Sequence, residues 1–335
     1  MGDDVPGRAV APAIAAAAEH IGRAATIWLG THVDPDGDAI GSLLGLGHVL
    51  RAAGKTVVCA CQDRPPREAA GLPGADAIVH APPDAVDLAI ALDAADTRRL
   101  GRLYTPEAWA RQPTVVVDHH VSNPGFGDVD VIDPAAASTA ELLLDLIDAL
   151  GAPVSAAAAE CLLTGIVTDT LGFRTSSTTP RSLAAAQRLM GAGASLAEVC
   201  QRAFFNQPLA TLRLTGRVLD TLTVDGPFVV AQIARADLAR FGVSAGDTSD
   251  ITRLLQSAAE PVAVAFVRER ADGDVDVSLR SHPGVDVGPA AAALGGGGHP
   301  QAAGARISGP LDAAVAAVRD ALHAHVRLPD GRGAP

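Results

Sequence analysis

The sequence is poor in lysine and in aromatic side chains, and both scarcities argue against particular functions. Lys55 is the only lysine in a chain of 335 residues, which argues against a Walker-A phosphate loop and against a Schiff-base enzyme. Aromatic residues make up 3% of the chain, so few side chains could stack on nucleic-acid bases. The formal net charge of -12 opposes binding to long duplex nucleic acid. Any phosphate chemistry must therefore use metal ions, arginine, histidine or backbone amides.

Signals for export, membrane anchoring and disulfide bonding are also scarce. No apolar run approaches the roughly 20 residues that a membrane helix needs. The segment Met1–Pro6 lacks the basic start of a signal peptide. Four cysteines are too few for a disulfide scaffold in a chain of this length. We therefore expect a cytoplasmic protein that does not associate with membranes.

The hydrophobic pattern predicts two domains of different class. In the first half, short apolar runs alternate with helical patterns, which is typical of a mainly parallel α/β sheet flanked by helices. After residue 221, strand-like runs mix with helices and predict a smaller α+β domain. We predict a first domain at 1–190, a helical linker at 191–220, a second domain at 221–328 and a disordered tail at 329–335.

Metal-type side chains follow three predicted strands of the first domain. The residues that come after the strands at 25–29, 86–92 and 114–117 are His32, Asp36, Asp38, Asp93, Asp118, His119 and His120. Parallel strands bring their carboxyl ends to one edge of the sheet, where ligands bind. A further acid, Asp169, ends an apolar helical stretch, where an unpaired charge would be costly to bury. Each acid alone could be a cap or turn residue, but histidine with several carboxylates at matching positions predicts a Mn²⁺ or Mg²⁺ site.

These residues lie in motifs that resemble a known family. The segments HVDPDGDAIGS at 32–42, DHH at 118–120 and GIVTDT at 165–170, together with Asp93, resemble in order and spacing the four motifs of the DHH phosphoesterase family. That family includes nucleases of short oligoribonucleotides, RecJ-type exonucleases and family II inorganic pyrophosphatases. The resemblance implies an enzyme that uses two divalent cations, with Mn²⁺ preferred and Mg²⁺ as the alternative. Leu171 stands where many nanoRNases of this family have glycine.

The resemblance also implies a ligand set in which Asp93 bridges the two ions. One ion would be bound by His32, Asp36 and Asp93, and the other by Asp38, Asp93, His119 and Asp169. Four carboxylates then offset the four positive charges, and without cations their mutual repulsion should destabilise the site. Two such ions can activate water, so no covalent nucleophile is required.

Three neighbouring residues receive other roles from the same resemblance. Asp34 would be a turn residue rather than a ligand. Asp118 would orient an imidazole. His120 would contact the substrate phosphate or protonate the leaving oxygen, which makes it, with Asp93, a predicted catalytic residue. Separately, Gly45 and Gly47 lie inside a helical stretch and are expected to mark close helix packing.

The second domain carries its own phosphate-binding signals. Arginine suits bidentate phosphate binding, and glycine lets backbone amides approach an anion closely. By composition alone, the glycine run at 295–298 could equally be a flexible loop. The segments SLRS and GGGGH nevertheless resemble the DHH-associated domain of the nanoRNase branch, which implies a substrate cleft between the domains. The residues implied to bind substrate in this domain are Arg280, Ser281, Gly297, Gly298 and His299.

The expected activity is hydrolysis of very short nucleotides. Candidate substrates are nanoRNA and pApA, which would yield mononucleotides, together with cyclic dinucleotides and 3′-phosphoadenosine 5′-phosphate. The expected partners are small nucleotides and short single-stranded RNA, and relatives suggest a homodimer. A family II pyrophosphatase is disfavoured because its second domain carries a lysine-rich loop. A non-catalytic sensor of cyclic dinucleotides is disfavoured because all six inferred ligands are present.

Overall fold

The chain divides into two compact units, Met1–Asn206 and Gln207–Pro335. The computed structural model describes residues 10–244 and 248–328, apart from the side chains at 249 and 250. The tail predicted at 329–335 lies outside the described residues. The boundary between the units falls inside the segment 191–220, for which a linker is predicted. Within the described ranges, no helix combines the length and the apolar character needed to cross a membrane.

The first unit contains a five-stranded parallel sheet, which confirms the predicted fold class. Its strands are β1 (Thr26–Thr31), β2 (Thr56–Ala60), β3 (Leu88–Leu92), β4 (Thr114–Asp118) and β5 (Val129–Ile132). They lie in the order β2-β1-β3-β4-β5, so the direction of winding reverses between β1 and β3. Ligands of open α/β sheets bind at the carboxyl ends of the strands at such a reversal. The residues that follow β1 and β3 therefore lie where a site is expected.

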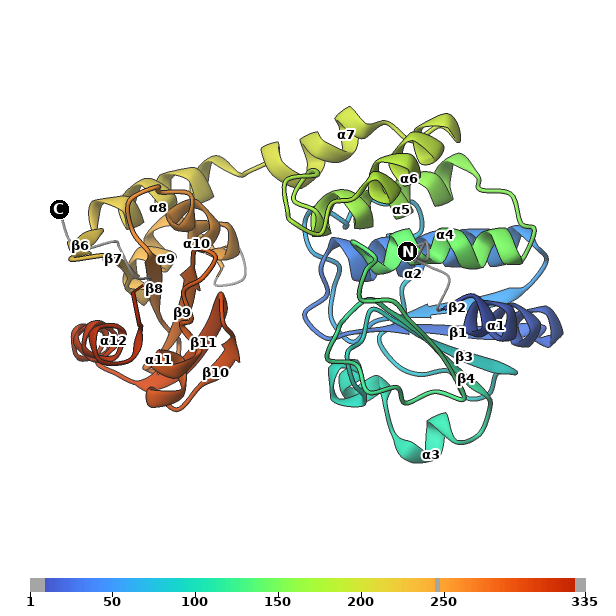
Figure 1. The fold of residues 1–335 in the computed structure, drawn as a ribbon, viewed down its shortest axis with the longest axis horizontal. Coiled ribbons are helices and arrows are strands. Elements are labelled where there is room, and N and C mark those ends of the chain that lie inside the picture. Colours follow the sequence, from blue (N-terminus) through green and yellow to red (C-terminus); the bar gives the residue numbers. More distant parts are fainter. Residues whose placement is uncertain (1–9, 245–247, 329–335) are drawn as a thin grey trace, which may run out of the picture. The chain divides into compact units, whose positions relative to one another are not determined.

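Helices cover both faces of this sheet, most of them on one side (Figure 1). Alternate strand residues point to opposite faces, so Ile27 and Leu29 pack against the larger helical layer while Trp28 packs against Trp109. The larger layer contains α1 (Ala11–Arg23), α2 (Gly37–Ala52), α4 (Thr139–Ala149), α5 (Ala156–Asp169), α6 (Pro180–Gly191), α7 (Leu196–Cys200) and the π-helical turn η3 (Gln201–Phe205). The smaller layer contains η2 (Thr97–Leu103) and α3 (Pro106–Trp109).

Helices α2 and α5 approach each other closely because glycines line one face of α2. A β-carbon on Gly41 would lie 2.5 Å from the carbonyl oxygen of Cys161, and one on Gly45 would lie 2.6 Å from Cγ of Leu162. The predicted packing role of Gly45 is thereby confirmed. Residues four apart share a helix face, so this close contact extends along the helix. It brings the amino end of α2 next to the carboxyl end of α5, where Asp169 lies.

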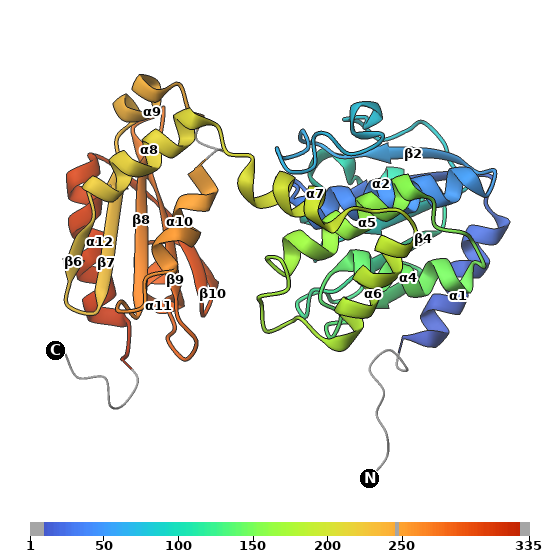
Figure 2. The same cartoon turned by 90° about the horizontal axis from the view of Figure 1, so that it is seen from above.

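The second unit contains a six-stranded mixed sheet, which confirms the predicted α+β class. The strands β6 (Thr223–Asp225), β7 (Phe228–Ile233), β8 (Ala263–Glu269), β9 (Asp274–Ser281), β10 (Gly297–His299) and β11 (Ala302–Ser308) lie in the order β10-β11-β9-β8-β7-β6. Helices α11 (Gly288–Ala293) and α12 (Leu311–His325) pack on one face. Helices α8 (Leu209–Asp220), α9 (Arg235–Phe241) and α10 (Ser249–Gln256) pack on the other (Figure 2).

Candidate metal centre

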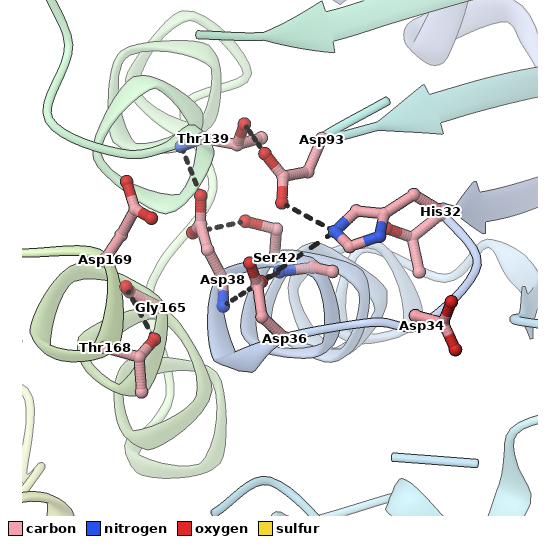
Figure 3. A network of polar contacts seen from close by, with 12 residues as sticks. His32, Asp34, Asp36, Asp38, Ser42, Asp93, Thr139, Gly165, Thr168 and Asp169 are labelled. Carbon is pink, nitrogen blue, oxygen red and sulfur yellow. Dashed lines mark hydrogen bonds and ion pairs between the residues drawn. The ribbon is translucent and has the colours of Figure 1, made fainter. Parts of the chain in front are cut away.

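Side chains from five elements converge at the carboxyl edge of the parallel sheet. β1 and β3 each place one residue directly after the strand, β4 places its ligand after Asp118, α2 contributes two residues at its amino end, and α5 contributes its last residue. These residues are His32, Asp93, His119, Asp36, Asp38 and Asp169. They are the six predicted metal ligands, and the fold brings all of them together. Figure 3 shows His32, Asp36, Asp38, Asp93 and Asp169.

The first group is formed by His32, Asp36 and Asp93. Nε2 of His32 lies 3.5 Å from Oδ2 of Asp93 and 3.9 Å from Oδ1 of Asp36. On the other side of the ring, Nδ1 of His32 lies 2.8 Å from the carbonyl oxygen of Val33. A proton on Nδ1 can therefore be donated to that carbonyl, which leaves the lone pair of Nε2 directed at the two carboxylates.

The second group is formed by Asp38, His119 and Asp169. Nε2 of His119 lies 3.6 Å from Oδ2 of Asp169 and 3.6 Å from Oδ1 of Asp93. One ligand atom from each member of this group lies within 4.8 Å of the others. Asp93 thus directs Oδ2 toward His32 and Oδ1 toward His119, so a single carboxylate lies between the two groups.

The two groups fit divalent cations. Separations of 3.5 and 3.6 Å are too long for hydrogen bonds between these atoms. Two atoms bound to one cation at about 2.1 Å lie roughly 3.0–3.5 Å apart, so the observed spacings suit shared coordination. Carboxylate oxygens mixed with imidazole nitrogen suit Mn²⁺ or Mg²⁺ better than a structural zinc ion.

The amino end of α4 donates hydrogen bonds to two of the carboxylates. The sequence did not predict these contacts. Asp38 accepts hydrogen bonds from the amides of Thr139 (2.7 Å) and Ala140 (3.0 Å) and from the hydroxyl of Ser42 (3.2 Å). The hydroxyl of Thr139 donates to Oδ1 of Asp93 at 2.9 Å (Figure 3). The Ser138 cap, whose hydroxyl accepts from the amide of the third helical residue, signals a helix start in the sequence. Nothing local signals which carboxylates that helix start contacts.

Two carboxyl groups of the centre have raised pKa values, so positive charge beside them would be stabilising. Burial and the negative charge of Asp93 raise the pKa of Asp169 to about 8, and the same causes raise the pKa of Asp38 well above its usual value. Burial lowers the pKa of His32, but the neighbouring carboxylates of Asp36 and Asp93, which favour the charged ring, outweigh it and raise that pKa to about 10. Without cations, protons therefore occupy the centre at neutral pH, and cations would have to replace them.

His120 differs from the ligands because Asp118 holds it. Nδ1 of His120 lies 2.7 Å from Oδ1 of Asp118, which is fully buried and accepts a further hydrogen bond from Asn123 at 2.6 Å. The hydrogen bond between Asp118 and His120 is the main cause that raises the pKa of His120 to about 9. His120 could form a third ligand group with Asp93 and His119, but its contact with Asp93 is made by Nδ1, the nitrogen that already faces Asp118. The geometry therefore favours a proton-carrying role for His120.

Two other residues, Asp34 and Arg99, lie near His32. Asp34 is exposed and lies apart from the ligand groups in Figure 3, and in the described ranges it belongs to no group that could hold an ion. This placement matches its predicted role as a turn residue. Arg99 was not predicted, yet its guanidinium lies 2.9 Å from Nδ1 of His32. It can donate a hydrogen bond to Nδ1 only when that nitrogen carries no proton, so this contact is an alternative to the hydrogen bond with Val33. The segment TRR at 97–99 gave no sign of this contact in the sequence.

The residues predicted to bind substrate in the second unit differ in their burial and in their hydrogen bonds. Arg280 is half-buried, and one guanidinium nitrogen donates to the carbonyl of Leu279 at 2.9 Å. Ser281 is buried and its hydroxyl donates to the carbonyl of Val285 at 2.6 Å. The proton of this hydroxyl is therefore donated within the domain, where it holds the turn that follows β9. Contact of Ser281 with a substrate stays a prediction.

The glycine run is a strand rather than a loop over part of its length. Gly297–His299 form β10, which pairs antiparallel with β11 at the edge of the sheet, and all three residues are exposed. A β-carbon on Gly298 would lie 2.6 Å from the carbonyl oxygen of Ala302. Close approach of two strands therefore requires glycine there, apart from any ligand. The edge position still leaves backbone groups of β10 available for binding.

The comparisons with known proteins agree with this organisation. The family described as "DHH family, N-terminal domain" matches residues 26–166, and the "DHHA1 domain" matches residues 225–324. The bifunctional oligoribonuclease and PAP phosphatase NrnA of Thermus thermophilus is 40% identical over 302 residues, which cover 88% of this chain and 89% of that protein. The protein of the same description from Bacillus subtilis is 28% identical, over 84% of this chain and 89% of its own length. A crystal structure of an exopolyphosphatase-related protein from Bacteroides fragilis superimposes with a TM-score of 0.88 at 27% identity, covering 93% of this chain and 96% of that one.

Proposed function

The chain belongs to the DHH family, and on this premise we propose that it is a phosphoesterase of very short nucleotides. The observation that carries the proposal is the convergence of six ligand-type side chains into two groups that share Asp93. The NrnA proteins of Thermus thermophilus and Bacillus subtilis, described as oligoribonucleases and PAP phosphatases, support the substrate class. The proposed substrates are nanoRNA and pApA, with cyclic dinucleotides and 3′-phosphoadenosine 5′-phosphate as further candidates.

Two divalent cations are part of this proposal. The first would be held by His32, Asp36 and Asp93, and the second by Asp38, Asp93, His119 and Asp169. Cations at these positions would supply Lewis acidity, which activates water and offsets the negative charge that develops on the phosphoryl group. We propose Mn²⁺ for these sites, with Mg²⁺ as the alternative, because both suit oxygen and imidazole ligands.

His120 is proposed to provide the proton for the leaving oxygen. Its pKa of about 9 keeps the ring protonated at neutral pH, and Asp118 holds that proton-bearing ring in one orientation. Nδ1 is committed to Asp118, so Nε2 is the nitrogen that can donate to a substrate. After donation, the negative charge of Asp118 favours return of a proton to the ring.

Arg280, His299 and the amides of Gly297 and Gly298 are proposed to bind the phosphates of the substrate. Burial and then the nearby charge of Arg253 lower the pKa of Arg280, so its positive charge lacks stabilisation. In the described part of the chain, no carboxylate forms an ion pair with Arg280. A substrate phosphate would supply the missing negative charge, and the guanidinium can bind it in a bidentate manner. Substrate binding by the second unit therefore rests mainly on Arg280.

The alternatives make different predictions about turnover. Incubation with Mn²⁺ and pApA should release AMP, with activity lost on chelation and restored by added Mn²⁺. A cyclic-dinucleotide sensor would bind the nucleotide and release no AMP. A pyrophosphatase would hydrolyse inorganic pyrophosphate far faster than pApA. Full turnover of pApA after complete removal of divalent cations would contradict the proposed function.

A further inference from the structure

Thr139 uses both of its hydrogen-bond donors on carboxylates of the metal centre. It is the first residue of α4, and its side chain is fully buried. Its amide donates to Oδ2 of Asp38 at 2.7 Å, and its hydroxyl donates to Oδ1 of Asp93 at 2.9 Å. One residue therefore fixes two ligands that come from different elements, α2 and the end of β3.

The contacts of α4 fall on one side of the centre. Asp93 directs Oδ1, the oxygen that Thr139 contacts, toward His119, and it directs Oδ2 toward His32. Asp38, which the amides of Thr139 and Ala140 contact, belongs to the group that contains His119 and Asp169. All three hydrogen bonds from this helix end therefore act on the second ion position.

These hydrogen bonds suit a ligand-orienting role. A hydroxyl that donates to a carboxylate oxygen occupies one lone pair and leaves another for a cation, while it prevents rotation of the carboxylate. Neutral donors also stabilise the buried charge of Asp38 without adding a positive group that would compete with the cation. The position of α4 is itself fixed, because the Ser138 hydroxyl caps the helix by accepting from the amide of Glu141 at 3.1 Å. The donors are thus rigid relative to the carboxylates.

We propose that Thr139 is a positioning residue that sets the affinity of the second ion position. This inference rests on the proposed function, because it takes Asp38, Asp93, His119 and Asp169 as ligands of that ion. It assigns Thr139 no contact with substrate. It predicts an asymmetric effect. Loss of the Thr139 hydroxyl should weaken binding of the second ion. Binding of the first ion, toward which the other oxygen of Asp93 is directed, should stay nearly unchanged.

The test is calorimetric titration of Mn²⁺ into metal-free protein, with Thr139→Val and Thr139→Ser compared with the wild type. Valine keeps the shape of threonine without the hydroxyl, and serine keeps the hydroxyl. A matched control is Thr164→Val, which removes a buried hydroxyl on α5 that donates to the backbone carbonyl of Glu160. Loss of such a supporting group typically costs about 10- to 100-fold in metal affinity. In Thr139→Val we expect a loss of Mn²⁺ affinity of this size at one of the two sites. In Thr139→Ser and Thr164→Val we expect affinities within about threefold of the wild type.

Melting temperatures with and without Mn²⁺ give a second readout that does not depend on activity. The increase caused by Mn²⁺ should be smaller in Thr139→Val and unchanged in Thr139→Ser and Thr164→Val, since ligand affinity sets this increase. Equal weakening of both sites, or wild-type binding by Thr139→Val, would overturn the positioning role while the metal centre stands. Should Thr139→Val fail to fold, weakening of the second site alone in Thr139→Ala, with wild-type titration by Thr139→Ser, would support the role, and wild-type titration by Thr139→Ala would overturn it. A wild-type protein that binds no Mn²⁺ would overturn the metal centre and this inference together.

Discussion

Asp38 and Gly165 lie in direct contact across the interface of α2 and α5. A β-carbon at position 165 would lie 2.5 Å from Oδ1 of Asp38 and 2.7 Å from Cβ of Ala140. The position therefore tolerates no side chain without movement of either the carboxylate or α4. The glycine in the GIVTDT motif thus serves the site as well as the packing of the helices.

Replacing this glycine should damage both the metal centre and the fold. Gly165→Ala is expected to displace Asp38 from the amides of α4, to lower Mn²⁺ affinity at least about tenfold and to destabilise the protein by about 1–3 kcal/mol through overpacking. The control is Gly22→Ala in α1, where no atom lies within 4 Å of the new β-carbon. Alanine there should be neutral or should stabilise by up to about 1 kcal/mol. Calorimetric Mn²⁺ titration and urea unfolding measure both effects, and wild-type Mn²⁺ affinity in Gly165→Ala would contradict the contact.

Metal-free protein should lose stability as the pH rises from about 6 to about 10. In the folded state the pKa of Asp169 is raised to about 8 and that of His32 to about 10. Both values exceed those of the unfolded chain, so the folded state binds more protons, and this stabilisation disappears as the pH passes through the folded-state values. Melting temperatures in chelator should fall across this range. Saturating Mn²⁺ should largely abolish the fall, because cations replace those protons; a metal-free melting temperature that rises with pH would count against the assignment.

The orientation of His120 by Asp118 predicts a change in the pH profile. Asp118→Asn removes the negative charge whose hydrogen bond is the main cause of the raised pKa of His120. The alkaline limb of kcat for pApA should therefore move to lower pH, with a fall in kcat and little change in Mn²⁺ stoichiometry. Asp128→Asn is the control, because Asp128 accepts only a backbone hydrogen bond, from Thr114, among the contacts of the described residues. An unmoved alkaline limb in Asp118→Asn would remove His120 as the proton donor.

Arg280 should affect binding more than chemistry. Arg280→Ala is expected to raise KM for pApA at least about tenfold with kcat within a few-fold of the wild type, since charge-assisted phosphate contacts are worth about 1.5–3 kcal/mol. Arg306→Ala is the control, because Arg306 already pairs with Asp274 on β9 and with Asp272 in the turn before it. Steady-state kinetics at saturating Mn²⁺ separate the two constants. A kcat loss without a KM change in Arg280→Ala would place this residue in the chemical step instead.

The fold was predictable where strands are buried on both faces. Leu88–Leu92 is buried throughout and reads in the sequence as a continuous apolar run, as expected of parallel strands. Val129–Ile132 and Thr223–Asp225 were not predicted. Both lie at sheet edges, carry polar residues and are mostly not buried, so pairing with a neighbour rather than hydrophobic pattern makes them strands.

The candidate ligands were predictable because they lie in compact motifs, whereas their support was not. Thr139 contacts Asp93 and Asp38 across 46 and 101 residues of sequence, and no local pattern encodes such distances. The direction of the Ser281 hydroxyl likewise depends on a turn that packs against it. Leu171 has a φ of 50°, a left-handed conformation that favours glycine. The glycine that many nanoRNases have at this position therefore has a backbone explanation.

Two cations are proposed to share Asp93. Anomalous diffraction at the manganese absorption edge, from crystals of the wild-type protein and of Asp93→Ala grown with Mn²⁺, can locate both ions and their ligands. We predict two peaks about 3.5–4 Å apart in the wild type. One should lie beside His32 and Asp36, and the other beside Asp38 and Asp169. Asp93→Ala should lose at least one peak and all turnover of pApA. A single peak in the wild type, peaks away from these residues, or an unchanged pair in Asp93→Ala would contradict the account.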